Sequence, residues 1–236
     1  NKCPKNKNNF LHGVQELCRA NDTLFIIDEM ITGFRWHLNG AQTYFGIEPD
    51  LSTFGKGMAN GFSVAALVGR KEIMDVGSIS EKGAERTFLL SSTHGAEMVG
   101  LRAFIETIKV YKEQKVCEHM WSYGKKLHDG VMDISTELGL ENNFSIIGPA
   151  ISQNFITKDL EGEISMPLRT LFSQEMVKNG VLMSWIATSL SHQDKELEIT
   201  LKAVKKSLSV LSEALNNGVE NYLIGDPVKP VFRKFN

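Results

Sequence analysis

Continuous apolar runs in the first third of the chain predict strands of a buried sheet. Residues 24–27 form a compact run that stops abruptly at the acidic pair Asp28 and Glu29, and residues 63–69 form a second run. Residues 87–90 are a third, shorter candidate. Strands without polar alternation are typical of a parallel sheet that is covered on both faces. We therefore expect these strands in the interior of an α/β fold.

Apolar residues spaced three and four positions apart predict helices around these strands. Residues 10–20 form one such segment, whose apolar face contains Phe10, Val14, Leu17 and Cys18. A longer helix begins near Gly95, and its apolar positions are Ala96, Val99, Ala103, Phe104, Ile108 and Tyr111. Strands that alternate with helices indicate α/β organisation, in which acids and glycines at strand ends are placed where such sheets bind ligands.

The second half of the chain predicts strands and two further helices. Residues 143–157 fit one or two strands interrupted by Gly148 and Pro149, and residues 181–187 fit another strand. Ser165 is placed to cap a helix that ends at Gly180. The last helix has a stripe of Leu197, Leu201, Val204, Leu208, Leu211 and Leu215. We expect this helix to cover a sheet, with a short coiled coil as the alternative. A boundary between the two halves is expected at residues 113–120.

Composition and charge are those of an ordinary folded protein. Of the 236 residues, 42% are hydrophobic, and 26 Lys+Arg against 28 Asp+Glu give a formal net charge of −2. This balance lacks the basic field that binds nucleic-acid phosphates, and no apolar run approaches the roughly 20 residues that span a bilayer. We expect neither nucleic-acid nor membrane partners. Cys3, Cys18 and Cys117 share no C-x-x-C spacing, which favours a cytoplasmic protein without disulfides.

The glycine-rich stretch at residues 55–61 fails to match three common motifs. A phosphate-binding P-loop needs glycine where the chain has Asp50, and a dinucleotide fingerprint needs its third glycine where the chain has Asn60. A nucleophile elbow around Ser63 needs glycine in place of Ala65. The six histidines form no i,i+4 pair with a glutamate, so we expect no zinc hydrolase and no metal site.

A lysine between two glycines, downstream of an acid, remains to be explained. Lys56 lies between Gly55 and Gly57, in a loop that leads into a predicted strand, and Asp28 ends another strand. Flanking glycines indicate close backbone approach or unusual dihedral angles, although a surface lysine and a strand-end cap are the simpler alternatives. A lysine in a partly desolvated pocket forms an imine with a carbonyl. Together the two residues indicate a site for pyridoxal 5′-phosphate (PLP), whose pyridinium nitrogen needs a carboxylate.

The sequence around these two residues resembles a known cofactor signature. Residues 24–35 read LFIIDEMITGFR, and residues 49–56 read PDLSTFGK. Together they are similar to the signature of class III PLP-dependent aminotransferases. Within that class they resemble the glutamate-1-semialdehyde aminomutase branch and related aminotransferases of sugar and cell-surface biosynthesis. The resemblance is dense over residues 24–70 and looser to about residue 215.

The resemblance implies a role for each matching residue. Asp28 should bind the ring nitrogen of PLP and keep it protonated, and Lys56 should form the Schiff base and then move a proton between Cα and the cofactor. Met30 falls where the family packs an apolar side chain against the ring. Ile31 replaces a glutamine of many ω-aminotransferases, which favours the aminomutase-like branch.

A later segment resembles the part of the family that binds the cofactor phosphate across a subunit interface. Residues 89–97 read LLSSTHGAE. The resemblance implies that Thr93 binds the phosphate of the neighbouring subunit and that the enzyme is a homodimer. Thr93 fits equally well as the N-cap of the next helix, and His94 fits a buried histidine better than a catalytic one.

The fold implied by the resemblance is that of the PLP-dependent transferases of fold type I, which is aspartate aminotransferase-like. Residues 1–117 are expected to be the C-terminal portion of the PLP-binding large domain, and residues 118–236 the small α/β C-terminal domain. The family's upstream segment supplies a phosphate loop and an aromatic residue against the ring, and neither is visible here. We therefore expect a fragment that binds PLP poorly by itself.

The function implied for the complete protein is transfer of an amino group between a small-molecule amino donor and a carbonyl acceptor. One alternative is an aminomutase, in which the amine returns to the same substrate molecule. An alternative of another class is a truncated, non-catalytic fragment that acts only as an interaction module. All three interpretations stay open on the sequence.

Overall fold

Helix α5 (Val116–Glu137) contains the division between the two units of the chain. The structure is a computed structural model that describes residues 9–78, 83, 85, 95 and 97–230. Unit 1 comprises residues 1–118 and unit 2 comprises residues 119–236, each with its own set of internal contacts. The division therefore falls one residue from the boundary expected on the sequence.

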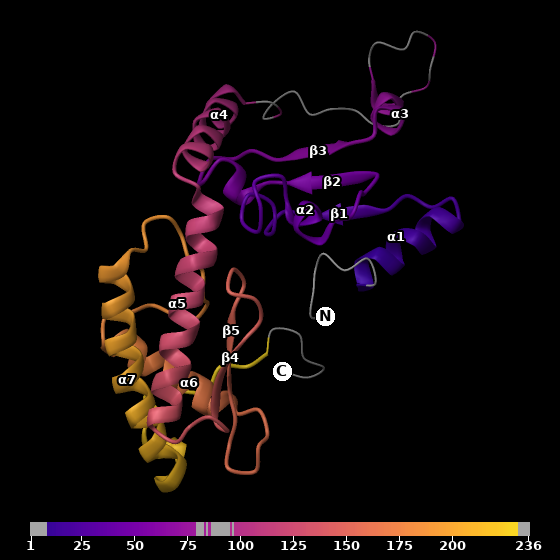
Figure 1. The fold of residues 1–236 in the computed structure, drawn as a ribbon. Helices are drawn as coiled ribbons and strands as arrows, with labels where there is room; N and C mark the ends of the chain where they lie inside the picture. Colours follow the sequence, from indigo (N-terminus) through magenta and orange to yellow (C-terminus); the bar gives the residue numbers. More distant parts are fainter. Residues whose placement is uncertain (1–8, 79–82, 84, 86–94, 96, 231–236) are drawn as a thin grey trace. The chain divides into compact units, whose positions relative to one another are not determined.

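Unit 1 is built on a three-stranded sheet in the order β1–β2–β3 (Figure 1). Strand β1 (Ile26–Asp28) pairs in parallel with β2 (Leu51–Phe54), and β2 pairs antiparallel with β3 (Ala66–Gly69). The parallel register sets Asp28 opposite Thr53. The carboxyl ends of β1 and β2 therefore lie at the same edge of the sheet.

The central strand β2 was not predicted from the sequence pattern. Its sequence, Leu-Ser-Thr-Phe, lacks the continuous apolar run expected of a buried strand. Ser52 is nevertheless buried, and its hydroxyl donates a hydrogen bond to Gln42 Oε1 at 2.7 Å. A buried hydroxyl whose hydrogen bond is made is tolerated inside a sheet. The polar residue that obscured the strand is thus accommodated by a partner ten positions earlier in the chain.

The expectation that the sheet is buried on both faces is wrong for the described part of unit 1. β1 is an edge strand, and Ile26 is 53% exposed. Leu67 and Val68 of the other edge strand, β3, are exposed as well. β1 also begins two residues later than the apolar run that predicted it. An apolar run specifies extended backbone, but it does not specify which surface will pack against the strand.

Helix α1 (Phe10–Ala20) has the predicted bounds but buries its polar side. His12 and Gln15 are buried, and each makes a hydrogen bond to a backbone group 33 residues further along the chain, at 3.0 and 2.6 Å. Phe10, on the predicted apolar face, is 72% exposed. The hydrogen bonds of two buried polar residues, rather than the apolar stripe, therefore set the orientation of this helix.

Short helices and one long helix complete unit 1. Helix α4 begins at residue 98, three residues after the predicted start near Gly95. The strand predicted at residues 87–90 lies outside the described residues. The remaining elements of unit 1 are α2 (Ala41–Phe45), η1 (Lys56–Met58), α3 (Lys71–Met74), η2 (Asp75–Gly77) and α4 (Met98–Glu113).

An aromatic cluster centred on Phe34 forms part of the core of unit 1. The Phe34 ring centroid lies 5.5 Å from that of Phe54 in β2, and 5.8 and 6.3 Å from those of Phe104 and Tyr111 in α4. The thiol of Cys117 lies next to this cluster, with Sγ 3.9 Å from the Phe34 carbonyl oxygen. Packing of these rings joins the loop after β1 to β2 and to α4.

The surroundings of Cys117 are apolar enough to shift the pKa of the groups they contain. Burial raises the pKa of the Cys117 thiol to about 11 and raises the pKa of Tyr111. Burial also lowers the pKa of the nearby Arg35 guanidinium. Each shift favours the neutral form, as expected for groups removed from water.

Unit 2 packs α5, α6 (Met166–Lys178) and α7 (Asp194–Asn217) around a β-hairpin (Figure 1). Strands β4 (Phe144–Ile147) and β5 (Asn154–Thr157) pair antiparallel. The chain leaves β4 through Gly148, whose φ of +90° suits glycine, as the Gly-Pro interruption indicated. Fully buried members of the shared core include Val131, Phe155, Phe172, Met176, Val204, Leu208 and Leu211.

The predicted cap of α6 is confirmed, whereas the strand predicted after it is wrong. The Ser165 side chain accepts a hydrogen bond from the Leu168 N–H at 3.3 Å. Residues 181–187 are irregular, although Met183 and Ile186 are buried in the core of unit 2. An apolar run that packs onto helices can be buried without strand pairing. A short η3 (Val219–Asn221) follows α7.

We also compared the helices of the described residues with the length and apolar character of a membrane-spanning helix. None of them combines the length and the apolar character needed to cross a bilayer.

We predict that Phe172→Ala destabilises unit 2 strongly. Phe172 is fully buried, with its ring centroid 4.7 Å from that of Phe144 and 4.9 Å from that of Phe155. Truncation removes these contacts and leaves a cavity, which costs about 3–5 kcal/mol of unfolding free energy. Urea denaturation measures the loss. Val177→Ala, at an exposed position of the same helix, should change it by less than about 0.5 kcal/mol. Equal effects of the two variants would contradict this assignment of the core.

We also predict that Cys117 resists alkylation in the native protein. Its pKa of about 11 leaves little thiolate at pH 8, whereas an unfolded cysteine has a pKa of about 8.5. Iodoacetamide should therefore modify Cys117 at least about 100-fold faster in urea than in buffer. Because only the unfolded state loses this proton between about pH 8.5 and 11, this group lowers folding stability as pH rises through that range. Peptide mass analysis would contradict the prediction if native and unfolded protein reacted equally fast.

Candidate functional site

The two residues predicted to bind PLP lie at the same edge of the unit 1 sheet. Asp28 is the last residue of β1, and Lys56 is the first residue of η1, two positions after the end of β2. Because β1 and β2 run in parallel, the segments that follow them leave the sheet on the same side. In open α/β sheets, this carboxyl edge is where ligands bind.

The Asp28 carboxylate is held through one of its oxygens. Asp28 Oδ1 accepts a hydrogen bond from the Met30 N–H at 2.9 Å and another from Thr53 Oγ1 at 3.2 Å. The residue is exposed, so the carboxylate is accessible at the sheet edge. Thr53 was not predicted as a site residue. The signal that identifies it is the register of β1 on β2, which the sequence does not give.

Met30 connects Asp28 to the segment that contains Lys56. A Cβ atom on Gly55 would lie 2.4 Å from Met30 Cε and 2.9 Å from Met30 Sδ. Glycine therefore permits the close approach that the flanking glycines of Lys56 indicated. At Gly57 the nearest atom to such a Cβ is the Tyr111 hydroxyl at 3.8 Å, an ordinary contact. Met30, whose N–H donates to Asp28 Oδ1, therefore packs against the residue that precedes Lys56.

Lys56 has an unusual backbone conformation. Its φ is +48°, in the left-handed region that costs a non-glycine residue roughly 1–3 kcal/mol. The side chain is exposed and makes no hydrogen bond or ion pair with the described residues. The partly desolvated pocket expected around this amine is therefore not formed by the part of the chain that the structure describes. The amine is accessible at the sheet edge.

The remaining predicted site residue, Thr93, lies outside the described residues, as does His94. Arg169 carries a guanidinium that could bind a carboxylate, but this group is engaged within unit 2. Nη1 donates to the Phe155 carbonyl at 2.6 Å, and the guanidinium carbon lies 4.0 Å from the centre of the Phe155 ring. This arrangement supports a structural role for Arg169. Among the described residues, no three His, Cys, Asp or Glu side chains are grouped to hold a metal ion.

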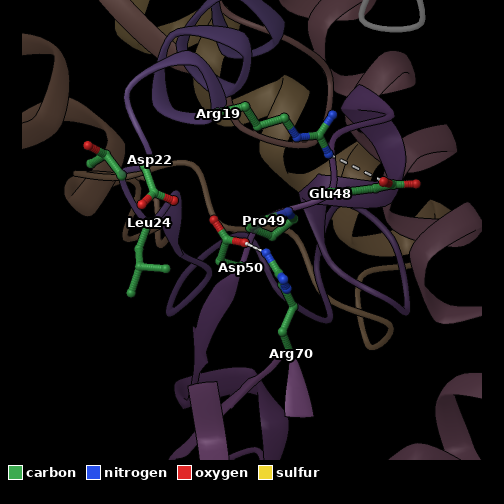
Figure 2. A pocket seen from close by; sticks show the side chains of 8 residues that line it. Arg19, Asp22, Leu24, Glu48, Pro49, Asp50 and Arg70 are labelled. Carbon is green, nitrogen blue, oxygen red and sulfur yellow. Dashed lines mark hydrogen bonds and ion pairs between the residues drawn. The ribbon is translucent and has the colours of Figure 1, made fainter. Parts of the chain in front are cut away.

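A cavity of about 430 Å³ lies at the other end of the sheet (Figure 2). Its arginines are ion-paired: Arg70 Nη1 lies 2.8 Å from Asp50 Oδ1, and Arg19 Nη2 lies 3.5 Å from Glu48 Oε2. The Phe25 N–H and the Arg70 side chain lower the pKa of Asp50. The lining residues precede β1 and β2 or follow β3: Arg19, Asp22, Thr23, Leu24, Glu48, Pro49, Asp50 and Arg70. The cavity is therefore distinct from the edge that bears Asp28 and Lys56.

Comparison with known sequences gives a match over most of the chain. The family profile described as Aminotransferase class-III matches residues 4–217. A 3-aminobutyryl-CoA aminotransferase of Cloacimonas acidaminovorans is 34% identical over 212 residues, covering 89% of this chain and 49% of the relative. A glutamate-1-semialdehyde 2,1-aminomutase of Alkaliphilus oremlandii is 32% identical over 218 residues, covering 86% of this chain and 48% of the relative.

Comparison with solved structures gives the same fold. The PLP internal aldimine form of the FumI protein of Sphingopyxis sp. MTA144 matches with a TM-score of 0.75 and 24% identity, over 88% of this chain and 48% of that one. An ω-transaminase from Sphaerobacter thermophilus matches with a TM-score of 0.74 and 22% identity, over 86% and 48%. At these identities the likeness shows the α/β fold of PLP-dependent transferases and nothing more specific.

The chain spans about half the length of the curated relatives that it matches. The matched residues include β1 with Asp28 and the segment after β2 that contains Lys56. From the profile match over residues 4–217 and the curated relatives at 34% and 32% identity, the chain belongs to the class III aminotransferase family.

Proposed function

We propose that the complete protein is a PLP-dependent aminotransferase that moves an amino group between a small-molecule amino donor and a carbonyl acceptor. Unit 1 is the C-terminal portion of the PLP-binding large domain of a fold type I enzyme, and unit 2 is its small C-terminal domain. The three cysteines without a paired spacing favour the cytoplasm as its compartment.

One observation carries this proposal: the parallel pairing of β1 with β2 presents an accessible carboxylate and an accessible amine at one sheet edge. The apolar side chain of Met30, two residues after Asp28, packs against Gly55, the residue before Lys56. PLP needs a carboxylate for its ring nitrogen, an amine for its aldehyde and an apolar surface for its ring. The residues present at the edge fit these three requirements.

Asp28 would hold the ring nitrogen of PLP. A carboxylate facing that nitrogen keeps a proton on it through a charge-assisted hydrogen bond, worth roughly 1.5–3 kcal/mol. When bound, PLP withdraws electrons from the Cα of the amine attached to it. The Met30 N–H and the Thr53 hydroxyl, both on Asp28 Oδ1, fix the carboxylate in direction before any ligand binds.

Lys56 would hold the aldehyde carbon of PLP and afterwards move a proton at the substrate Cα. The left-handed φ of Lys56 sets the direction in which its side chain leaves the backbone. The preceding residue, Gly55, packs against Met30. Thr93, by its resemblance to the family, would hold the phosphate from the neighbouring subunit of a homodimer.

An aminomutase is the second candidate. It is supported by Ile31, which replaces the glutamine of many ω-aminotransferases, and by the 32% identity to a glutamate-1-semialdehyde 2,1-aminomutase. Single-turnover product analysis distinguishes the two reactions. A transferase leaves an oxo product and an aminated cofactor, whereas a mutase leaves an isomer of its substrate.

A candidate of another class is a non-catalytic interaction module. It is supported by Lys56, whose side chain is exposed in the described part of the chain. Formation of a cofactor adduct at Lys56 separates this candidate from both enzymes.

We predict that PLP attaches to Lys56. Borohydride reduction of the complete protein in the presence of PLP, followed by peptide mass analysis, should find a pyridoxyl group on Lys56, and Lys56→Ala should abolish that adduct. Lys115 offers a matched control, because it is also exposed and has a left-handed φ of +49°. Lys115→Ala should leave the adduct unchanged. An adduct at another lysine would overturn the site, and no adduct would favour the interaction module.

We further predict that Thr93 acts on the PLP of the neighbouring subunit. Thr93→Val removes a hydroxyl donor and should weaken PLP retention by roughly 0.5–1.5 kcal/mol, or about 2- to 13-fold. Mixing Thr93→Val with Lys56→Ala chains tests the arrangement. In a mixed dimer, the Lys56-containing site then receives an intact threonine from the second chain. PLP bound per Lys56 should return to the wild-type level.

Two results would contradict this arrangement. If Thr93 served its own subunit, mixing would leave PLP retention at the level of the Thr93→Val protein. A protein that retained PLP while staying monomeric would also exclude it. Sedimentation velocity at the working concentration measures the second outcome.

A further inference from the structure

Glu29 is a fully buried carboxylate that the proposed reaction does not use. It directly follows Asp28, and its exposed fraction is 0%. A carboxylate removed from water destabilises the folded state strongly unless its oxygens receive hydrogen bonds. Because Glu29 is next to Asp28, the proposed ligand of the PLP ring nitrogen, the hydrogen bonds of Glu29 can affect how Asp28 is held.

Three donors converge on the Glu29 side chain. Oε2 accepts from the Ala41 N–H at 2.9 Å, and Oε1 accepts from the Gln42 N–H at 2.7 Å. The Thr32 hydroxyl also donates to Oε2. The first two donors are the free N–H groups at the start of α2, which a helix leaves without internal partners. One side chain therefore binds both the turn that follows it and the helix twelve residues further along.

The backbone around Glu29 leaves space for this contact. Gly40 has a φ of +88°, and a Cβ atom there would lie 2.7 Å from Glu29 Oε1. The Gly33 N–H donates to the Glu29 carbonyl at 2.8 Å, and a Cβ atom on Gly33 would lie 2.7 Å from that same oxygen. Glycines at both positions permit the loop of residues 30–42 to close on Glu29.

The same anchoring reaches the Asp28 carboxylate through the backbone. The Glu29 N–H donates to the Thr53 carbonyl at 2.9 Å, which continues the pairing of β1 with β2 past Asp28. The next N–H along the chain, that of Met30, donates to Asp28 Oδ1. The direction of the Met30 N–H therefore depends on the peptide that Glu29 holds between strand and loop.

We propose that Glu29 is a positioning residue, whose buried carboxylate fixes the loop of residues 30–42 and thereby keeps the Met30 N–H on the Asp28 carboxylate. The inference rests on the proposed function only in taking Asp28 as the ligand of the PLP ring nitrogen. The positioning is a property of the chain without cofactor.

The test measures the Met30 amide by NMR in the full chain without PLP. Asp28→Ala removes the acceptor and defines the resonance of a released Met30 amide. Glu29→Gln, which places an NH₂ group against an N–H of α2, should move the Met30 resonance toward that reference. It should also speed exchange of the Met30 amide with water roughly 5- to 10-fold.

A carboxylate that merely caps α2 would give a different result. The amides of Ala41 and Gln42 would then change while the Met30 amide stayed at its wild-type position, and this outcome would overturn the proposal. Glu175→Gln is the control, since Glu175 is a buried glutamate of α6 in unit 2 that accepts from Lys178 Nζ at 2.6 Å. A Met30 shift of equal size in this control would indicate general loosening and would also overturn the proposal.

A milder pair of variants decides the question if Glu29→Gln does not fold. Thr32→Val removes one donor and should move the Met30 resonance part of the way, whereas Thr32→Ser keeps the hydroxyl and should leave it unmoved. An unmoved resonance in Thr32→Val, or equal movement in both variants, would reject the role of Glu29. Because none of these measurements involves PLP, they are independent of the adduct at Lys56.

Discussion

The parallel pairing of β1 with β2 is the constraint on which the candidate site depends. Hydrogen bonds from the Asp50 N–H to the Phe25 carbonyl, at 2.8 Å, and from the Glu29 N–H to the Thr53 carbonyl, at 2.9 Å, bracket the pair. The pairing brings Asp28 and the segment before Lys56 to one edge, although they are separated along the chain by more than twenty residues. In the observed register, the Thr53 hydroxyl donates to the Asp28 carboxylate. A slip of β1 along β2 by one residue would put the side chains of Asp28 and Thr53 on opposite faces of the sheet and break this hydrogen bond.

Buried polar groups hold this pairing in place. Gln42 is the shared residue, since its N–H donates to Glu29 Oε1 and its side-chain oxygen accepts from the hydroxyl of Ser52 in β2. The loop after β1, the start of α2 and the central strand are therefore joined by one hydrogen-bonded set. Leaving one member of such a set unpaired costs about 1–3 kcal/mol, so the set specifies a single arrangement of the loop.

Unit 2 depends on a different kind of interaction. Its helices and hairpin share a continuous apolar core, and the leucine-rich stripe of α7 places Val204, Leu208 and Leu211 in it. Here the expectations from the sequence agree with the structure for the hairpin, the capped α6 and the long α7, because apolar periodicity determines which helix face is buried. There are two exceptions. Residues 181–187 are buried against helices without forming a strand, and helix α5 was not predicted.

The sequence by itself determined the family signature, the bounds of α1 and the cap of α6, and it proposed Asp28 and Lys56 as site residues, because these follow from local spacing and local backbone preferences. Only the tertiary structure decided that the polar segment at Ser52 is the central strand and that α1 turns His12 and Gln15 inward. It also decided that Thr53 donates to the Asp28 carboxylate and that Glu29 is buried against the start of α2. Each of these features rests on a hydrogen bond between groups far apart in the chain. A polar side chain is read as exposed until its partner is known, and the partner is supplied by strand register and loop closure rather than by any neighbouring residue.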